Sequence, residues 1–294
     1  HDVPRALDAA TIAGALSLDA WRANLSPIDP RVVALRPAPG QERGAALLRA
    51  LLADSDLHGG GQARRVQDPL SFRCLAPVNG YALTQADTAR TTIKAELNGA
   101  CDSPAVLPNG ALMSTVNFDT TALALSLEAL GLAAAHVATL ATFRIMKLMS
   151  PALSDLPRFL TRHGGTHAGF ATTQKTAAAL DAEIRRLALP LGPMTAPVAD
   201  GVEDYAPMTP AIVDKTTAIG TRLNSLAAIE LVVAAEAADL RGAIRLGQGT
   251  RRAHEFVRCY VAPLDDDRPM GVEYERLAAA IRAGELARAV EAAR

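Results

Sequence analysis

The longest apolar stretch of the chain, residues 120–150, constrains the fold more than any other feature. Between Asp119 and Arg144 its only formally charged residue is Glu128. As a helix, the stretch is long enough to span a bilayer. However, threonine, serine and histidine recur on several faces of such a helix, and alanine dominates its composition. We therefore favour a helix buried on all sides, in a bundle or between subunits, over a membrane span.

Helical patterns recur along the rest of the chain. Aromatic residues make up only 4% of it, and no stretch of useful length alternates in the manner of a strand. A second long apolar helix should begin at Thr209-Pro210, because a capping residue followed by proline is typical of a first helical turn. We predict helices at residues 3–20, 41–54, 120–150, 209–241 and 274–293.

These helices predict an all-α fold, with a single helical domain over residues 1–294. The two long apolar helices should be buried, roughly antiparallel neighbours in a long central helix bundle. Because they lack a polar face, other helices must cover them. We therefore expect an oligomeric helical core in which neighbouring subunits supply part of the cover.

Composition excludes several classes of function. The formal net charge of −1 gives no sign of a nucleic-acid surface or a basic membrane contact. The three cysteines, Cys74, Cys101 and Cys259, are too few and too scattered for a disulfide framework or a zinc cluster. No secretion signal opens the chain, so we expect a cytoplasmic protein. The start at His1 suggests a processed N-terminus or a subunit of a split protein.

Two short patterns have weak functional interpretations. Residues 59–61, Gly-Gly-Gly, could cradle a phosphate, but no Lys-Ser/Thr follows and no strand precedes them, so a flexible loop is favoured. His163 and His167 are four residues apart, a spacing that could place two metal ligands on one helix face. Gly164 and Gly165 lie between them and oppose a helix, and no third ligand is evident. We favour a loop there and expect no metal.

One segment carries a more specific signal, namely Gln67-Asp68-Pro69-Leu70-Ser71-Phe72-Arg73. It resembles the Gln-Asp-x-Tyr-Ser-x-Arg signature of the histidine and aromatic amino acid ammonia-lyases. Further blocks resemble the same family in the same order, at residues 29–41, 98–104, 116–119, 151–157, 202–208 and 230–241. The resemblance covers essentially the whole chain and corresponds to the C-terminal part of the family. It implies the long-helix bundle of the ammonia-lyase/fumarase-like type, assembled as a tetramer.

The family's electrophile is absent from this chain. That group, 4-methylidene-imidazol-5-one (MIO), forms by self-cyclisation of an internal Ala-Ser-Gly, and the sequence contains no Ser-Gly dipeptide. The resemblance therefore implies that a second polypeptide, carrying the N-terminal lyase region, supplies the MIO group.

The resemblance also implies the residues of a site. Gln67 matches a glutamine that orients groups at the electrophile, and Arg73 matches the arginine that binds the substrate carboxylate, for which its planar fork is suited. Phe118 matches an aromatic pocket wall, and Glu203 an acidic residue that contacts the substrate side chain in histidine ammonia-lyases. Plainer alternatives remain open: an Arg73 paired with Asp68, a core Phe118 and a helix-end Glu203.

Four departures from the family pattern concern the candidate site. Leu70 stands where the family has a tyrosine, and leucine cannot donate a hydrogen bond to a substrate. Tyr205 and Asp119 replace histidines, and Val202 replaces a glutamine. A changed substrate, changed chemistry or lost catalysis would each produce such a pattern.

Three hypotheses follow. In the first, the chain is a subunit of an enzyme that eliminates ammonia from an amino acid, or shifts its amine, and Gln67, Arg73, Phe118 and Glu203 converge on one cleft, with neighbouring subunits able to contribute. In the second, the chain is a noncatalytic scaffold or regulatory partner that keeps only the oligomerisation core. In the third, the pocket serves chemistry that needs no cyclised electrophile.

Overall fold

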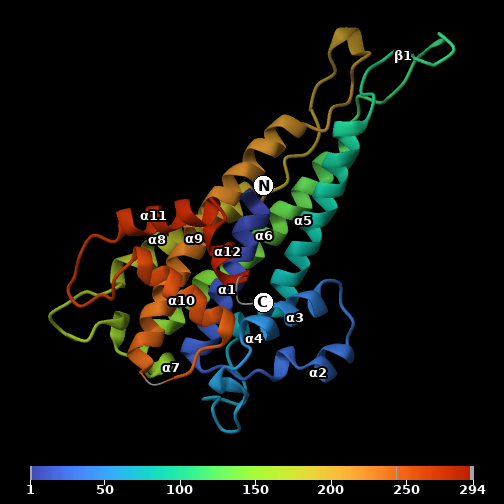
Figure 1. Ribbon diagram of the computed structural model, residues 1–294. Coiled ribbons are helices and arrows are strands. Elements are labelled where there is room, and N and C mark those ends of the chain that lie inside the picture. Colours follow the sequence, from blue (N-terminus) through green and yellow to red (C-terminus); the bar gives the residue numbers. More distant parts are fainter. Residues whose placement is uncertain (1, 243, 292–294) are drawn as a thin grey trace.

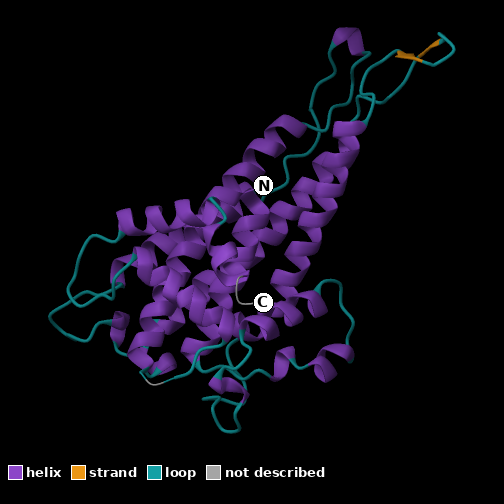
Figure 2. Ribbon diagram, viewed as in Figure 1, coloured by secondary structure: helices purple, strands orange, loops and turns teal. Residues whose placement is uncertain are grey.

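The computed structural model describes residues 2–242 and 244–291 and confirms the all-α fold (Figures 1 and 2). Long helices form an elongated body, and two loops project beyond one end of it. The described part of the chain contains one short hairpin, in which β1 (Ala105–Val106) pairs with β2 (Leu112–Met113). This hairpin lies in one of the projecting loops.

Three helices form the centre of the body: α1 (Asp2–Trp21), α6 (Thr121–Leu148) and α9 (Thr209–Arg241). The predicted helices at residues 3–20, 120–150 and 209–241 are therefore confirmed. The second half of α9, from residue 226 to 238, is buried at every position, because α1, α6, α10 and α11 pack around it. Its composition of alanine, valine and leucine with few polar groups is that of a helix covered on all sides.

The two long apolar helices lie parallel, so the predicted antiparallel arrangement is wrong. The hydroxyls of Thr120 and Thr209 are 2.7 Å apart at the beginning of both helices, and Arg144 pairs with Glu230 near their ends. The reason is α8 (Ala171–Leu187), which lies between them in sequence and carries the chain back. Because one helix returns, the next one must run in the direction of the first.

The remaining helices cover this centre. α5 (Leu75–Asn98) runs antiparallel to α1, since its first turns lie beside the second half of α1. α3 (Gln41–Leu51) packs on α5 and confirms the predicted helix at residues 41–54. α10 (Gln248–Tyr260) packs across α1, α9 and the C-terminal helices. The short helices are α2 (Pro30–Ala34), α4 (Leu70–Arg73) and α7 (Pro151–Ser154).

The predicted C-terminal helix at residues 274–293 is divided in two. The structure has α11 (Gly271–Arg282) and α12 (Glu285–Glu291), separated by Gly284 at φ 78°. Glycine adopts this left-handed conformation without the cost that a Cβ atom imposes, and it therefore ends α11. The last residues of the predicted helix, 292 and 293, lie outside the described part of the chain.

Among the helices that the structure describes, α6 and α9 are long and apolar enough to cross a membrane by length and composition. In the fold, 56% of the most apolar window of α6 and 78% of that of α9 are buried. Glu128, the charged residue within the apolar stretch, is buried as well, and it pairs with Lys215 of α9 at 2.5 Å. Such burial and internal charge pairing are typical of core helices.

Candidate functional site

The segment 67–73, called the arginine end below, lies in the lower part of the body, where α4 is labelled in Figure 1. Gln67 is exposed, and the Leu70 side chain is 61% exposed at the first residue of α4. Arg73 is half-buried, and its Nε donates to the backbone carbonyl of Asp68 at 2.7 Å. Among the described residues, none is hydrogen-bonded to its two terminal nitrogens. The guanidinium fork is therefore held at its base and free at its tip.

Asp68 does not pair with Arg73 through its carboxylate. One of its oxygens accepts from Nε1 of Trp21 at 2.8 Å, and the other accepts from the backbone N–H of Asn24 at 2.7 Å. Phe72 stacks on the Trp21 ring with centroids 4.4 Å apart. The alternative of an Arg73 paired with Asp68 therefore holds for the backbone carbonyl of Asp68, whereas its carboxylate binds Trp21 and Asn24. The buried half of the segment anchors it, and the other half faces outward.

A buried ion pair anchors the arginine end to the core. Arg144 of α6 donates from Nε and Nη2 to the two carboxylate oxygens of Glu230 in α9, at 2.6 and 3.0 Å, and both side chains are fully buried. The Nη1 of Arg144 donates to the carbonyl of Ser71 at 2.9 Å, and the Ser17 hydroxyl donates to Glu230 at 2.8 Å. Neither Arg144 nor Glu230 was among the predicted site residues, because a single sequence does not show which charged residues pair with each other.

Three further arginines, Arg22, Arg64 and Arg241, lie close to one another near the arginine end and make this region cationic. Arg64 pairs with Asp155 and lies over the Trp21 ring, 5.0 Å from its centroid. Burial, together with the positive charges of Arg64 and Arg22, lowers the pKa of Arg241 to about 10. Arg241 therefore stays protonated at neutral pH, and the local potential attracts anions such as a carboxylate.

Phe118 lies at the opposite end of the body and is 60% exposed, so the alternative of a core phenylalanine is wrong. It lines a hollow of about 450 Å³, which we call the apolar hollow. Its walls come from the residues before α6 and the residues that lead into α9, namely Phe118, Asp119, Thr120 and residues 205–211. The volume is in the range of small-molecule sites.

A short hydrogen-bond chain crosses the wall of the apolar hollow. The Thr121 hydroxyl donates to Oδ2 of Asp119 at 2.9 Å and lies 2.8 Å from the Tyr205 hydroxyl. Glu203 is exposed two residues before Tyr205, and its backbone pairs with Val198. Because α9 begins six residues later, Glu203 is not a carboxylate at the start of that helix.

One chain does not bring the two groups of predicted residues together. The Ser71–Arg144 bond fixes the arginine end beside the last turns of α6, whereas Phe118 precedes its first residue, Thr121. The helix rise places Thr121 and Arg144 about 35 Å apart. Gln67, Leu70 and Arg73 thus form one group, and Phe118 and Glu203 belong to another.

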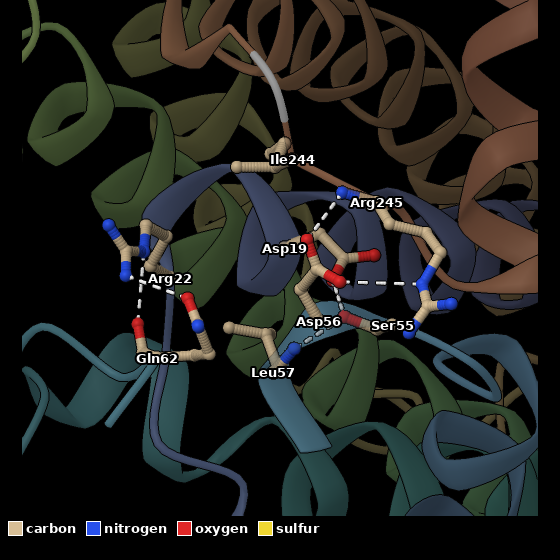
Figure 3. Close-up of a pocket in the computed structure, with 8 residues that line it drawn as sticks. All are labelled: Asp19, Arg22, Ser55, Asp56, Leu57, Gln62, Ile244 and Arg245. Carbon is tan, nitrogen blue, oxygen red and sulfur yellow. Dashed lines mark hydrogen bonds and ion pairs between the residues drawn. The ribbon is translucent and has the colours of Figure 1, made fainter. Parts of the chain in front are cut away.

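A third cluster, shown in Figure 3, contains none of the predicted residues. Asp19, near the end of α1, accepts hydrogen bonds from the hydroxyls of Ser55 and Thr250 and from the backbone N–H of Gly247. Burial raises the pKa of Asp19, although these hydrogen bonds partly oppose the shift. The adjoining cavity of about 10 Å³ has room for roughly one water molecule, so the cluster joins helices and is no substrate site.

His163 and His167 lie in a loop, as predicted, with ring centroids 4.8 Å apart. His167 bonds to Asp266 through Nε2 at 3.0 Å and to Thr166 through Nδ1 at 2.9 Å. Within residues 2–242 and 244–291, no group of three or more histidine, cysteine, aspartate or glutamate side chains is arranged to hold a metal ion. The described cysteines are all free thiols.

The arrangement is that of a long-helix bundle with an arginine whose guanidinium tip is free at one end and an apolar hollow at the other. The pattern of the family described as aromatic amino acid lyase matches residues 1–259, and the chain belongs to this family. A histidine ammonia-lyase of Symbiobacterium thermophilum is 38% identical over 293 residues, which are 99% of this chain and 58% of that protein.

Solved structures agree with this assignment. Ergothionase from Treponema denticola, an ergothioneine-degrading enzyme, has a TM-score of 0.91 at 30% identity, over 97% of this chain and 57% of that one. Tyrosine aminomutase from Streptomyces globisporus has a TM-score of 0.88 at 28% identity, over 99% of this chain and 59% of that one. The chain thus spans little more than half the length of these relatives.

Proposed function

We propose that this chain is the C-terminal part of an ammonia-lyase-like enzyme that eliminates ammonia from a histidine-like or aromatic amino acid, or shifts its amine. The observation that carries the proposal is the free guanidinium tip of Arg73, in the same short segment as the exposed side chain of Gln67. Two terminal N–H groups in a fixed fork match the geometry of a carboxylate. Every α-amino acid substrate carries such a group.

Each residue has a defined task in this proposal. Arg73 holds the substrate carboxylate, and the uncharged amide of Gln67 donates and accepts where charge moves during the reaction. Phe118 and the apolar hollow receive the side chain, and Glu203 favours a polar or basic ring over a phenyl ring. Leu70, in place of the family tyrosine, contributes apolar surface beside Arg73.

The electrophile must come from elsewhere. The chain has no Ser-Gly dipeptide from which MIO could form, but the exposed amide of Gln67 suits a position next to that polar ring. When bound, the MIO group supplies the electrophile for the substrate amine. We assign it to a second polypeptide that carries the N-terminal lyase region, in an assembly within the cytoplasm.

The assembly would also bring the arginine end of one subunit next to the apolar hollow of another. One face of α6 exposes a stripe of large side chains, the α6 stripe, which consists of Leu125, Leu132, His136 and Phe143. An apolar stripe of this length favours burial against another subunit. A second copy packed antiparallel on it would place its apolar hollow beside the arginine end of the first. A tetramer-like assembly, homomeric or with the second polypeptide, would complete each site in this way.

The test uses the purified assembly with everything that copurifies. Mass spectrometry should detect a polypeptide that contains the dehydrated, cyclised Ala-Ser-Gly. Replacing Arg73 with alanine should weaken binding of a substrate-like carboxylate by 100-fold or more, roughly the loss of a charge-assisted bidentate contact at about 3 kcal/mol. Arg73→Lys should recover little, because a point charge does not reproduce the fork.

The scaffold hypothesis is the second candidate, favoured by the missing Ser-Gly and by Leu70 in place of tyrosine. It predicts an assembly without the cyclised group and an Arg73→Ala variant with unchanged activity and binding. Observing both results would replace the enzyme proposal.

A further inference from the structure

The hydrogen-bond chain in the apolar hollow has a fixed direction. The Thr121 hydroxyl carries one proton, and it donates this proton to Oδ2 of Asp119 at 2.9 Å. A hydroxyl that has used its proton can only accept further bonds. The Tyr205 hydroxyl, 2.8 Å from Thr121, must therefore be the donor in the second bond. The chain runs from Tyr205 to Thr121 to Asp119.

The carboxylate of Asp119 fixes the direction of this hydrogen-bond chain. The carboxylate of Asp119 accepts twice from Thr121, from the hydroxyl and, through Oδ1, from the backbone N–H at 3.2 Å. An ionised carboxylate only accepts hydrogen bonds, so it cannot reverse the chain. The backbone bond fixes the carboxylate to the first residue of α6, which lies at the end of a long rigid helix.

The direction of the chain determines what Tyr205 can offer to a bound molecule. Its side chain is 53% exposed in the wall of the hollow. Its only proton is committed to Thr121, so its phenolic oxygen presents lone pairs and no donor to a bound molecule. The other side chains in that wall near it are mainly apolar, among them Phe118, Pro207 and Met208.

We propose that Tyr205 is a specificity-determining residue that accepts a hydrogen bond from the side chain of the substrate. This inference rests on the function proposed above and narrows its substrate class. The hollow takes an amino acid whose ring carries an N–H donor, such as an azole, in preference to a phenyl ring or a ring with only acceptor nitrogens. Thr121 and Asp119 are positioning residues, because they act through Tyr205.

The experiment compares three probes of similar shape on the purified assembly by calorimetry: 3-(imidazol-4-yl)propionate, 3-(pyridin-3-yl)propionate and 3-phenylpropionate. Near a pH of about 8 the imidazole ring is neutral and offers one N–H, whereas pyridine offers only an acceptor. The wild-type protein should bind the imidazole probe about 3- to 10-fold more tightly than the other two, as expected for one neutral hydrogen bond.

Three variants separate binding from structure. Tyr205→Phe keeps the ring and removes the acceptor, so it should abolish the preference for the imidazole probe over the pyridine probe while leaving the affinity for the phenyl probe unchanged. Thr121→Val releases the Tyr205 proton, so the pyridine probe should gain affinity. Thr121→Ser keeps the hydroxyl and should behave as the wild type does. Tyr81→Phe, on the exposed face of α5, is the matched control and should change nothing.

The outcomes distinguish the two proposals. If no probe binds to the wild-type assembly, the proposed function is wrong and this inference falls with it. If all three probes bind with equal affinity, or if Tyr205→Phe keeps the imidazole preference, the role of Tyr205 is refuted while the carboxylate site at Arg73 stands. A preference that Tyr205→Phe removes and Thr121→Ser keeps supports the inference.

Discussion

Removing one partner of the Arg144–Glu230 pair should strongly destabilise the protein. Both side chains are fully buried, and the pair joins α6 and α9 with two hydrogen bonds. Arg144→Met would leave the buried Glu230 carboxylate with the Ser17 hydroxyl as its one partner among the described residues, and would leave the Ser71 carbonyl without its donor. We expect the free energy of unfolding to fall by about 3–5 kcal/mol, the usual cost of breaking a buried ion pair.

Urea titration of the wild type, Arg144→Met, Glu230→Leu and the double variant would measure this loss as a double-mutant cycle. The protein concentration must be the same throughout, because assembly makes stability depend on it. The double variant contains no buried charge at this site, so it should be more stable than either single variant. A coupling free energy of about 2 kcal/mol or more is expected, at the upper part of the range for contacting residues.

The matched control is Arg43→Met in the Arg43–Asp87 pair, whose side chains are 43% and 46% exposed. Exposed pairs contribute about 0–1 kcal/mol, so this variant should unfold almost as the wild type does. A loss for Arg144→Met no larger than that for Arg43→Met, or two single losses that simply add in the double variant, would contradict a strongly stabilising role of the buried pair.

Three further outcomes are expected. Burial raises the folded-state pKa of Asp19, so its contribution to stability is full below the unfolded value of 3.8 and is lost as pH rises through the folded pKa. In thermal melts from acid to neutral pH, the melting temperature of Asp19→Asn should therefore rise relative to that of the wild type. Gly80→Ala should cost about 1–3 kcal/mol in urea, because the added Cβ would overlap the Gly40 carbonyl, whereas Gly164→Ala meets open space and should not. Leu132→Lys on the α6 stripe should reduce the sedimentation coefficient of the assembly without loss of helical circular dichroism.

The sequence predicted the helices better than their packing. The apolar, alanine- and leucine-rich composition of α6 and α9, together with the start signal Thr209-Pro210, predicts where these helices lie, because such signals act within each helix. Their parallel direction depends on the return of the chain through α8 and the following loop, which these local signals do not encode. The break at Gly284 had a local signal, a glycine within a helical pattern, that the amphipathic repeat around it concealed.

In the candidate site, too, local motifs were predictable and packing was not. The motif at residues 67–73 predicted Gln67 and Arg73 as site residues, but it did not predict the buried ion pair that holds this segment. Arg144 stands at the end of the apolar run, where a charged residue would ordinarily mark solvent, yet it is fully buried. Its partner Glu230 is 86 residues away in sequence. Only the fold shows that two lone charges in apolar helices neutralise each other and hold the carbonyl of Ser71.

The length of α6 limits how this chain can act. A hinge can close a cleft of a few ångströms, but a 28-residue helix fixes its ends about 40 Å apart, and α9, packed along it, resists bending. Arg73 and Phe118 therefore cannot contact one small amino acid within the same chain. If both residues bind the substrate, a second chain must supply one of them, and the contact that joins the subunits must also assemble the site. Loss of the subunit contact and loss of substrate binding should then follow a single concentration dependence.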